Sequence, residues 1–181
     1  MYYLQPTEEA PYMMTFRERM LFLENLKVKN HAGGTYMSAK VSPKSKKELS
    51  AWVSTHNIPN AADPKQYHAT IIYSRKGVPE IKDYVIPTPL TGKLTSWKIF
   101  DNGDKKCLVA IIDSPDLVKH HEEIRSKFGA THDYPQFSPH ITISYDYGNT
   151  KVPEELPNLP IVFDSTHIEP LDTEFTPAKK D

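Results

Sequence analysis

Two stretches of the sequence share one pattern, HATIIY at residues 68–73 and HITISY at residues 140–145. The likeness extends backwards without a gap, because residues 42–73 align with residues 114–145 at eight identical positions out of 32. Composition alone would give about two identities over such a length. A repeat constrains a fold more than any single motif does. We therefore expect the chain to hold two copies of one structural unit.

Each copy has the pattern of a strand, a helix and a second strand. The pair Ser-Pro, at residues 42–43 and 114–115, combines a preferred N-cap with proline at the first helical position. We predict helices at residues 44–56 and 116–128, preceded by strands at residues 35–41 and 107–113 and followed by strands at residues 66–74 and 138–145. A hairpin at Asn102-Gly103 follows a strand at residues 93–100, and a last strand covers residues 161–169. This order predicts an α+β domain of two pseudo-symmetric β-α-β lobes whose sheets face each other across a cleft.

The N-terminal region holds a further helix candidate. Thr15 and Glu18 form the Thr-x-x-Glu pattern of a capping box, and Gly33-Gly34 provides a stop. We expect residues 1–33 to form an N-terminal helical extension and residues 34–181 to form one domain. A domain of this size buries roughly 70% of the surface of its unfolded chain, which is enough for an autonomous core.

Composition and charge argue against several classes of protein. The longest apolar run, Cys107 to Ile112, is far shorter than the twenty or so residues of a membrane span. The chain has one cysteine and no signal-peptide pattern at residues 1–6, so we expect a cytoplasmic protein. The net charge of −1, from 22 Lys and Arg against 23 Asp and Glu, argues against a grip on long nucleic acids but not against a small anionic ligand. The lysine-rich stretch at residues 40–47 is interpreted as a solvated face.

The two repeated strands place a histidine and a threonine on the same face. Side chains alternate along a strand, so His68 lies on one face with Thr70, and His140 with Thr142. The opposite face, which includes Tyr73 and Tyr145, is expected to enter the core. The pseudo-symmetry of the two lobes would then bring both His-Thr pairs together. The alternative is two core histidines that are satisfied by neighbouring hydroxyl groups.

Two imidazoles and two hydroxyl groups around one cavity suit phosphodiester transfer. A neutral histidine can take a proton from the attacking hydroxyl group while a protonated histidine gives one to the leaving oxygen. The threonine hydroxyls can donate to the oxygens where negative charge grows. Metal chemistry fits the sequence poorly, because His120 and His121 are adjacent, no His-Glu-x-x-His motif occurs and the single cysteine excludes the usual zinc frameworks. We expect no metal ion and no cofactor.

The paired motifs and the β-α-β repeat resemble the two-histidine (2H) phosphoesterase superfamily, over about residues 35–169. Within it the chain is most similar to the phage anti-CBASS cyclic-oligonucleotide phosphodiesterases, which destroy the nucleotide signals of bacterial immunity. That likeness rests on residues 34–37 (GTYM), 68–71 (HATI), 96–98 (SWK) and 140–143 (HITI). It implies the 2H phosphoesterase (LigT-like) fold, with antiparallel sheets around a central cleft. It also implies that His68, Thr70, His140 and Thr142 carry catalysis, while Tyr36, Trp97 and Glu169 hold a nucleobase.

The resemblance leads to one preferred function and two alternatives. The preferred function is metal-independent hydrolysis of 3′-5′ bonds in cyclic di- and trinucleotides, a phage counter-defence activity in the host cytoplasm. The first alternative is an RNA-end enzyme of the same superfamily, acting on 2′,3′-cyclic phosphates or 2′-5′ linkages. The second is a non-catalytic nucleotide-binding sponge. As partners we expect a small cyclic nucleotide, no long nucleic acid and no membrane, with the protein itself a monomer or weak oligomer.

Overall fold

The computed structural model describes residues 33–101 and 103–171. The predicted N-terminal helix lies outside these residues. The described strands are β1 (Thr35–Val41), β2 (His68–Ser74), β3 (Leu90–Asp101), β4 (Lys106–Asp113), β5 (His140–Ser144) and β6 (Pro160–Pro170). The described helices are α2 (Pro43–Thr55) and α3 (Pro115–Phe128), with short 3₁₀ turns η1 (Pro64–Gln66) and η2 (Pro79–Asp83). Every strand and helix predicted within the described residues is therefore present.

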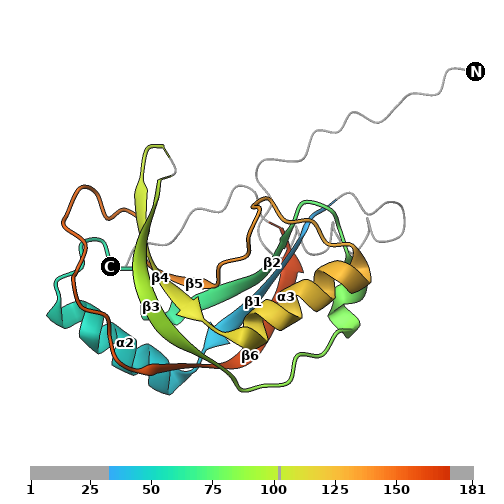
Figure 1. Cartoon of the computed structure of the whole chain (residues 1–181), viewed down its shortest axis with the longest axis horizontal. Coiled ribbons are helices and arrows are strands. Elements are labelled where there is room, and N and C mark those ends of the chain that lie inside the picture. Colours follow the sequence, from blue (N-terminus) through green and yellow to red (C-terminus); the bar gives the residue numbers. More distant parts are fainter. Residues whose placement is uncertain (1–32, 102, 172–181) are drawn as a thin grey trace, which may run out of the picture.

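The strands form an antiparallel sheet that closes on itself in the order β1-β2-β5-β4-β3-β6. One lobe contains β1, α2 and β2, and the other contains β4, α3 and β5, with the two helices well apart in Figure 1. The lobes meet at two places. Strand β2 pairs with β5 only at Ala69 and Ile141, and β6 pairs with both β1 and β3. The predicted α+β class and its two β-α-β lobes are confirmed, while the two facing sheets are joined into one closed sheet.

The Ser-Pro pairs begin both helices as the sequence predicts. The Ser42 hydroxyl accepts a hydrogen bond from the Ser45 amide at 3.3 Å, and the Ser114 hydroxyl accepts one from the Leu117 amide at 3.4 Å. Such caps satisfy amides that have no partner inside the helix. Helix α3 ends at Phe128 and is capped by Gly129, whose φ of 67° is a left-handed conformation that glycine adopts without strain.

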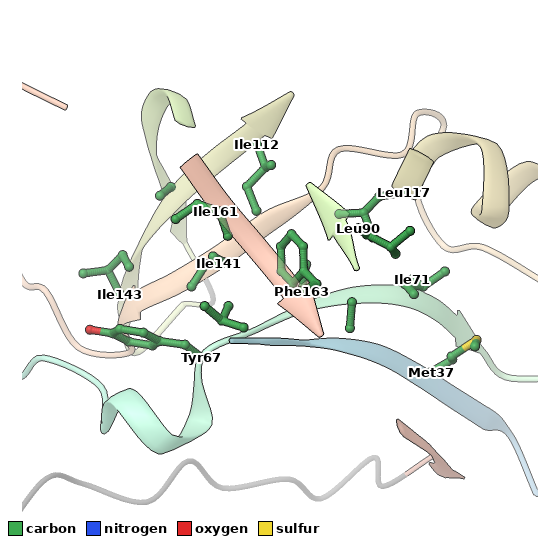
Figure 2. Close-up of a cluster of buried hydrophobic side chains, with 14 of the residues drawn as sticks. Met37, Tyr67, Ile71, Leu90, Ile112, Leu117, Ile141, Ile143, Ile161 and Phe163 are labelled. Carbon is green, nitrogen blue, oxygen red and sulfur yellow. The ribbon is translucent and has the colours of Figure 1, made fainter. Parts of the chain in front are cut away.

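The core lies between the helices and one face of the sheet. Helix α2 buries Leu49 and Val53, and α3 buries Leu117 and Ile124. Figure 2 shows side chains of β2, β5 and β6 converging there, among them Ile71, Ile141, Ile143, Ile161 and Phe163. Each of these side chains is completely or almost completely buried. The opposite face of β2 and β5 is consequently left for the polar residues of the two motifs.

A β-bulge interrupts β2 and β5 at the same place in the repeat. Met37 pairs with Ile72 and Ser38 with Thr70, so Ile71 has no partner on β1. In the second lobe Leu108 pairs with Ser144 and Val109 with Thr142, which leaves Ile143 without a partner on β4. An extra residue in one strand reverses the alternation of the side chains beyond it. Beyond the bulge in β2, Tyr73 therefore comes to the face of the histidines while Ile72 and Ser74 are buried.

The bulges overturn one expectation from the sequence. Tyr73 does not enter the core: it is half-buried and lies in register with Tyr36 of β1. Tyr145 packs part of its ring against the core, but its side chain hydrogen-bonds Thr142. The simple two-residue period of a strand fails for both tyrosines because each follows the extra residue of a bulge.

Candidate active site

The two histidines lie beside the one point at which β2 meets β5. Ala69 and Ile141, the register partners there, directly follow His68 and His140 in the chain. The Nδ1 atom of His68 is 2.6 Å from the carbonyl oxygen of Gln66, and the Nδ1 atom of His140 is 2.8 Å from that of Ser138. A carbonyl oxygen only accepts, so each Nδ1 carries a proton and donates it. This leaves the Nε2 atom of both imidazoles for chemistry.

Both histidines favour the neutral form in the free protein. Burial is the largest cause that lowers the pKa of His68 and that of His140 below 6.5, because it disfavours the charged imidazolium. Lys40 and the other histidine lower the pKa of His68 further. The carbonyl bonds to Gln66 and Ser138 act in the opposite direction. Because His140 contributes to lowering the pKa of His68, the two motifs lie within electrostatic reach of each other.

Tyr36 completes the first motif. Its hydroxyl group is 3.0 Å from the Oγ1 atom of Thr70, and its ring meets that of His68 edge-on, with centroids 6.3 Å apart. Burial raises the pKa of Tyr36 to about 12, so the phenol keeps its proton at neutral pH. A phenol that donates to Thr70 leaves the threonine proton free to point elsewhere. The predicted site residue Tyr36 therefore lies with His68 and Thr70.

The second motif has aromatic neighbours of its own. The ring of Phe100 packs edge-on against His140, with centroids 4.9 Å apart. Thr142 bonds Tyr145, and burial raises the pKa of this tyrosine. The two motifs thus have the same polar groups, but the tyrosines that bond their threonines come from different places. Tyr36 comes from β1, which is next to the strand of Thr70, and Tyr145 comes directly after β5, the strand of Thr142. The site is symmetric in its motifs and asymmetric in their surroundings.

Glu169 lies in the same row of residues as Tyr36. The register pairs Glu169 of β6 with Tyr36 of β1, and Tyr36 with Tyr73 of β2. Register partners on adjacent strands direct their side chains to the same face. The carboxylate of Glu169 also accepts from the Nε2 atom of His167 at 3.1 Å. The structure therefore brings two of the three predicted nucleobase residues to the face of the histidines.

The structure does not bring Trp97 to this face. Trp97 is in register with Ala110, which is in register with Ile141, and both partners are completely buried. Its ring stacks on Trp52 of α2 with centroids 5.5 Å apart, and its indole nitrogen donates to the carbonyl oxygen of Glu155 at 2.8 Å. Trp97 lies on the helix-covered face, and the nucleobase role predicted for it stays a prediction that this geometry does not support.

Two residues of the site were missed in the sequence. Lys40 is the register partner of His68, and it is half-buried rather than part of a solvated face. Alternation from Tyr36 through Ser38 to Lys40 is the signal that would have found it. Phe100 carries no such signal, because only the pairing of β3 with β4 and of β4 with β5 brings it to His140.

Metal ligands do not gather around these residues. Within residues 33–101 and 103–171, no three His, Cys, Asp or Glu side chains are placed so that they could hold a metal ion. The face of the histidines carries two imidazoles, two threonine hydroxyls, the phenols of Tyr36 and Tyr73, the ammonium group of Lys40 and the carboxylate of Glu169. These are groups that transfer protons and that bind a phosphodiester.

Comparison with known proteins decides the family. The family model described as anti-CBASS protein Acb1 matches residues 33–178. The chain belongs to this family. A relative of that name from Vibrio phage KVP40 is 37% identical over 144 residues, which cover 78% of this chain and 90% of that protein. Another, from Enterobacteria phage T4, is 32% identical over 147 residues, covering 81% of this chain and 93% of that protein.

Solved structures agree with the fold of this Acb1 family member. Escherichia coli LigT complexed with 3′-AMP matches with a TM-score of 0.55 at 15% identity, covering 77% of this chain and 95% of LigT. A crystal structure named phosphoesterase matches with a TM-score of 0.58 at 13% identity, covering 82% of this chain and 94% of that one. The predicted 2H phosphoesterase fold and the predicted anti-CBASS family are confirmed. Family and fold together support the prediction that the protein is a phosphodiesterase.

Proposed function

We propose that this Acb1 family member hydrolyses 3′-5′ bonds of cyclic di- and trinucleotide immune signals without a metal ion, in the cytoplasm of the host cell. The observation that carries the proposal is the pair of histidines, each held through Nδ1 by a backbone carbonyl, at the junction of two pseudo-symmetric strands. No described helix is long and apolar enough to cross a membrane. The predicted monomer or weak oligomer stays a prediction.

The proton transfers follow from the two imidazoles. One Nε2 atom, unprotonated, accepts the proton of the attacking hydroxyl group, which is either a water molecule or a 2′-hydroxyl of the substrate. Water gives the hydrolysed product directly, whereas the 2′-hydroxyl gives a 2′,3′-cyclic phosphate that water opens in a second step. The new bond forms at phosphorus and the P–O bond to the leaving oxygen breaks. The other Nε2 atom, protonated, gives its proton to that leaving oxygen. Each histidine ends with the proton state the other had, so the two roles exchange.

The hydroxyl groups of Thr70 and Thr142 stabilise the charge that develops on the phosphorus oxygens. Donors that are already aimed at this position need no rearrangement during the reaction. In this scheme the phenol of Tyr36, 3.0 Å from the Thr70 hydroxyl, donates to Thr70 and so fixes the direction of that donor. The row formed by Glu169, Tyr36 and Tyr73 supplies a carboxylate and two aromatic rings for one nucleobase. Stacking of a base on an aromatic ring contributes about 1–3 kcal/mol.

A panel of substrates tests the proposed function. Cyclic di- and trinucleotides are incubated with the protein beside RNA that ends in a 2′,3′-cyclic phosphate and RNA with 2′-5′ linkages. We expect linear products from the cyclic compounds and slower or no reaction of the RNA. Faster opening of the RNA ends would establish the first alternative, and tight binding of a cyclic nucleotide without turnover would establish the sponge.

Chelation should leave the activity unchanged. The reaction proposed here moves protons between imidazoles and substrate and requires no Lewis acid. Initial rates measured in EDTA and in excess Mg²⁺ or Mn²⁺ are expected to agree within about twofold. If EDTA abolishes turnover and a divalent ion restores it, the proton-transfer scheme is wrong.

The rate should follow a bell in pH that is displaced to the acid side. Burial lowers the pKa of both His68 and His140, so in the free protein each imidazolium loses its proton below pH 6.5. One histidine must be charged and one neutral, so kcat/KM falls on both sides of an optimum that we expect below about pH 6.5. A bound phosphate anion stabilises the imidazolium, so the optimum of kcat should lie at higher pH.

The limbs of that bell belong to the coupled pair and not to either residue alone. Pre-steady-state and steady-state rates between pH 4.5 and 9 measure both profiles, and the variant that lacks one histidine should lose one limb. A wild-type rate that rises steadily from pH 5 to 9 would show that no acid titrates, and the scheme with two histidines would have to be abandoned.

A further inference from the structure

A backbone oxygen at the bulge in β2 has no partner strand. Beyond Ala69, β2 no longer pairs with β5, so the edge of β2 that faces the second lobe is open at Ile71. The carbonyl oxygen of Ile71, the extra residue of the bulge, accepts a hydrogen bond from the Nδ1 atom of His121 at 2.7 Å. His121 belongs to α3, the helix of the other lobe. A side chain from one lobe thus supports the bulge next to Thr70 of the other.

In the second lobe a backbone amide, and not a side chain, binds the equivalent carbonyl oxygen. There the oxygen of Ile143, the equivalent bulge residue, accepts from the backbone amide of Ala62 at 2.8 Å. In the repeat, the residue of α2 that aligns with His121 is Leu49, which is completely buried. Packing of a helix at this position therefore needs only an apolar side chain. The imidazole in α3 supplies something that packing does not require.

The surroundings of His121 show what holds it. It is only 1% exposed, its ring lies parallel to Phe137 with centroids 3.8 Å apart, and the ring of His132 is 4.7 Å away. Its Nε2 atom is buried and has no hydrogen-bond partner among the described residues. Burial, with smaller effects of His132 and Arg125, lowers the pKa of His121 to about 4, so the ring is neutral. A buried polar ring costs free energy unless it is hydrogen-bonded, and the bond to Ile71 is the one that it makes.

We propose that His121 is a positioning residue for the first His-Thr motif. Its Nδ1–H group holds the bulge at Ile71, and the bulge sets the direction of Thr70 on one side and brings Tyr73 to the site on the other. The inference rests on the proposed phosphodiesterase function only for the expected loss of turnover when the bulge is displaced. A displacement of a catalytic group by about 1 Å costs up to about 10²-fold in turnover.

Two substitutions separate the hydrogen bond from the packing. His121→Leu introduces the residue that α2 has at the aligned position and removes the donor. His121→Asn keeps an amide nitrogen where Nδ1 stands. The control is His120→Leu, at the neighbouring buried position, where the imidazole bonds Tyr84 instead. We expect His121→Leu to lower kcat at least about tenfold, with KM changed less than about twofold. His121→Asn should recover most of kcat. His120→Leu should have the kcat and KM of the wild type.

The amide resonances of residues 68–73 in ¹⁵N spectra give a second reading that needs no substrate. They should move in His121→Leu, return toward the wild type in His121→Asn and stay in place in His120→Leu. A wild-type kcat in His121→Leu with unmoved resonances overturns the inference. Equal losses in the Leu and Asn variants also overturn it, since packing alone would then be responsible.

The same measurements keep the inference separate from the proposed function. If the wild type cleaves none of the cyclic nucleotides, the proposed function fails, and the resonance of Thr70 still decides whether His121 holds the bulge. Should His121→Leu fail to fold, His121→Gln takes its place, because its amide nitrogen lies one bond further along the side chain and does not reach the position of Nδ1. A wild-type spectrum and kcat in that variant would equally overturn the inference.

Discussion

Replacement of His68 or His140 by alanine should lower kcat by at least about 10²-fold, because each imidazole serves as a general acid or base in the proposed mechanism. Each side chain lies on the face opposite the core and is half-buried, so its removal leaves the core intact. We therefore expect the melting temperature to change by only a few degrees. Initial rates on a cyclic dinucleotide and a thermal unfolding curve measure the two quantities.

The double variant distinguishes a joint role from two independent ones. Groups that act as a unit lose little more when both are removed than when one is. The variant without both histidines should consequently be only slightly slower than either single variant. His56→Ala, at an exposed histidine that bonds the end of its own helix, is the matched control and should keep the wild-type rate. Turnover near the wild type in both single variants would remove the histidines from the mechanism.

Replacement of Thr70 or Thr142 by valine should lower kcat by about 10²-fold to 10³-fold, the cost of one donor aimed at developing charge. Valine has the shape of threonine and lacks the hydroxyl group, so the loss reports the hydrogen bond and not the packing. Serine keeps the hydroxyl group and should retain most of the rate. Steady-state kinetics of the four variants, with KM changed much less than kcat, would show that the bond forms in the transition state.

The tyrosine that bonds Thr70 extends this test. Tyr36→Phe removes the hydroxyl partner 3.0 Å from Thr70 but keeps the aromatic ring, so it should affect kcat less than Thr70→Val does. Its effect should also vanish in the Thr70→Val background, because the bond it breaks is already absent. If Thr70→Val and Thr142→Val are as active as the corresponding serine variants, the threonine hydroxyl groups contribute nothing to the charge stabilisation.

The sequence repeat predicts most of the fold because its signals are local. Ser42 and Ser114 mark the starts of both helices, and the alternation in β2 and β5 identifies the face that carries His68 and His140. The bulges at Ile71 and Ile143 have no such signal, since each depends on how two strands align. Tyr73 was therefore assigned to the wrong face by a rule that is correct only up to the bulge, whereas Tyr145 packs against the core as expected and also bonds Thr142.

Trp97 shows the limit of the pattern in another way. It shares an alternation with Thr95 and Ile99, and that pattern does not tell which face is buried. The partners do, because Trp97 aligns with Ala110 and Thr95 has no partner on β4. Lys40 was missed for the opposite reason: a run of lysines suggested solvent, although the strand period already placed this one beside the site.

Strand β6 connects the two lobes, because it pairs with β1 along most of its length and with β3 at its beginning. Thr35 and Pro170 are register partners with nearly the whole described chain between them, and the amide of Leu171 reaches the carbonyl oxygen of Gly34 at 2.9 Å. Bringing such distant segments together has a large cost in loop-closure entropy, and this cost precedes the stability that the contacts contribute. It therefore slows folding. The closed sheet, and with it the mutual position of the two histidines, therefore forms only after β6 has emerged from the ribosome. The candidate site is consequently completed late in the synthesis of the protein.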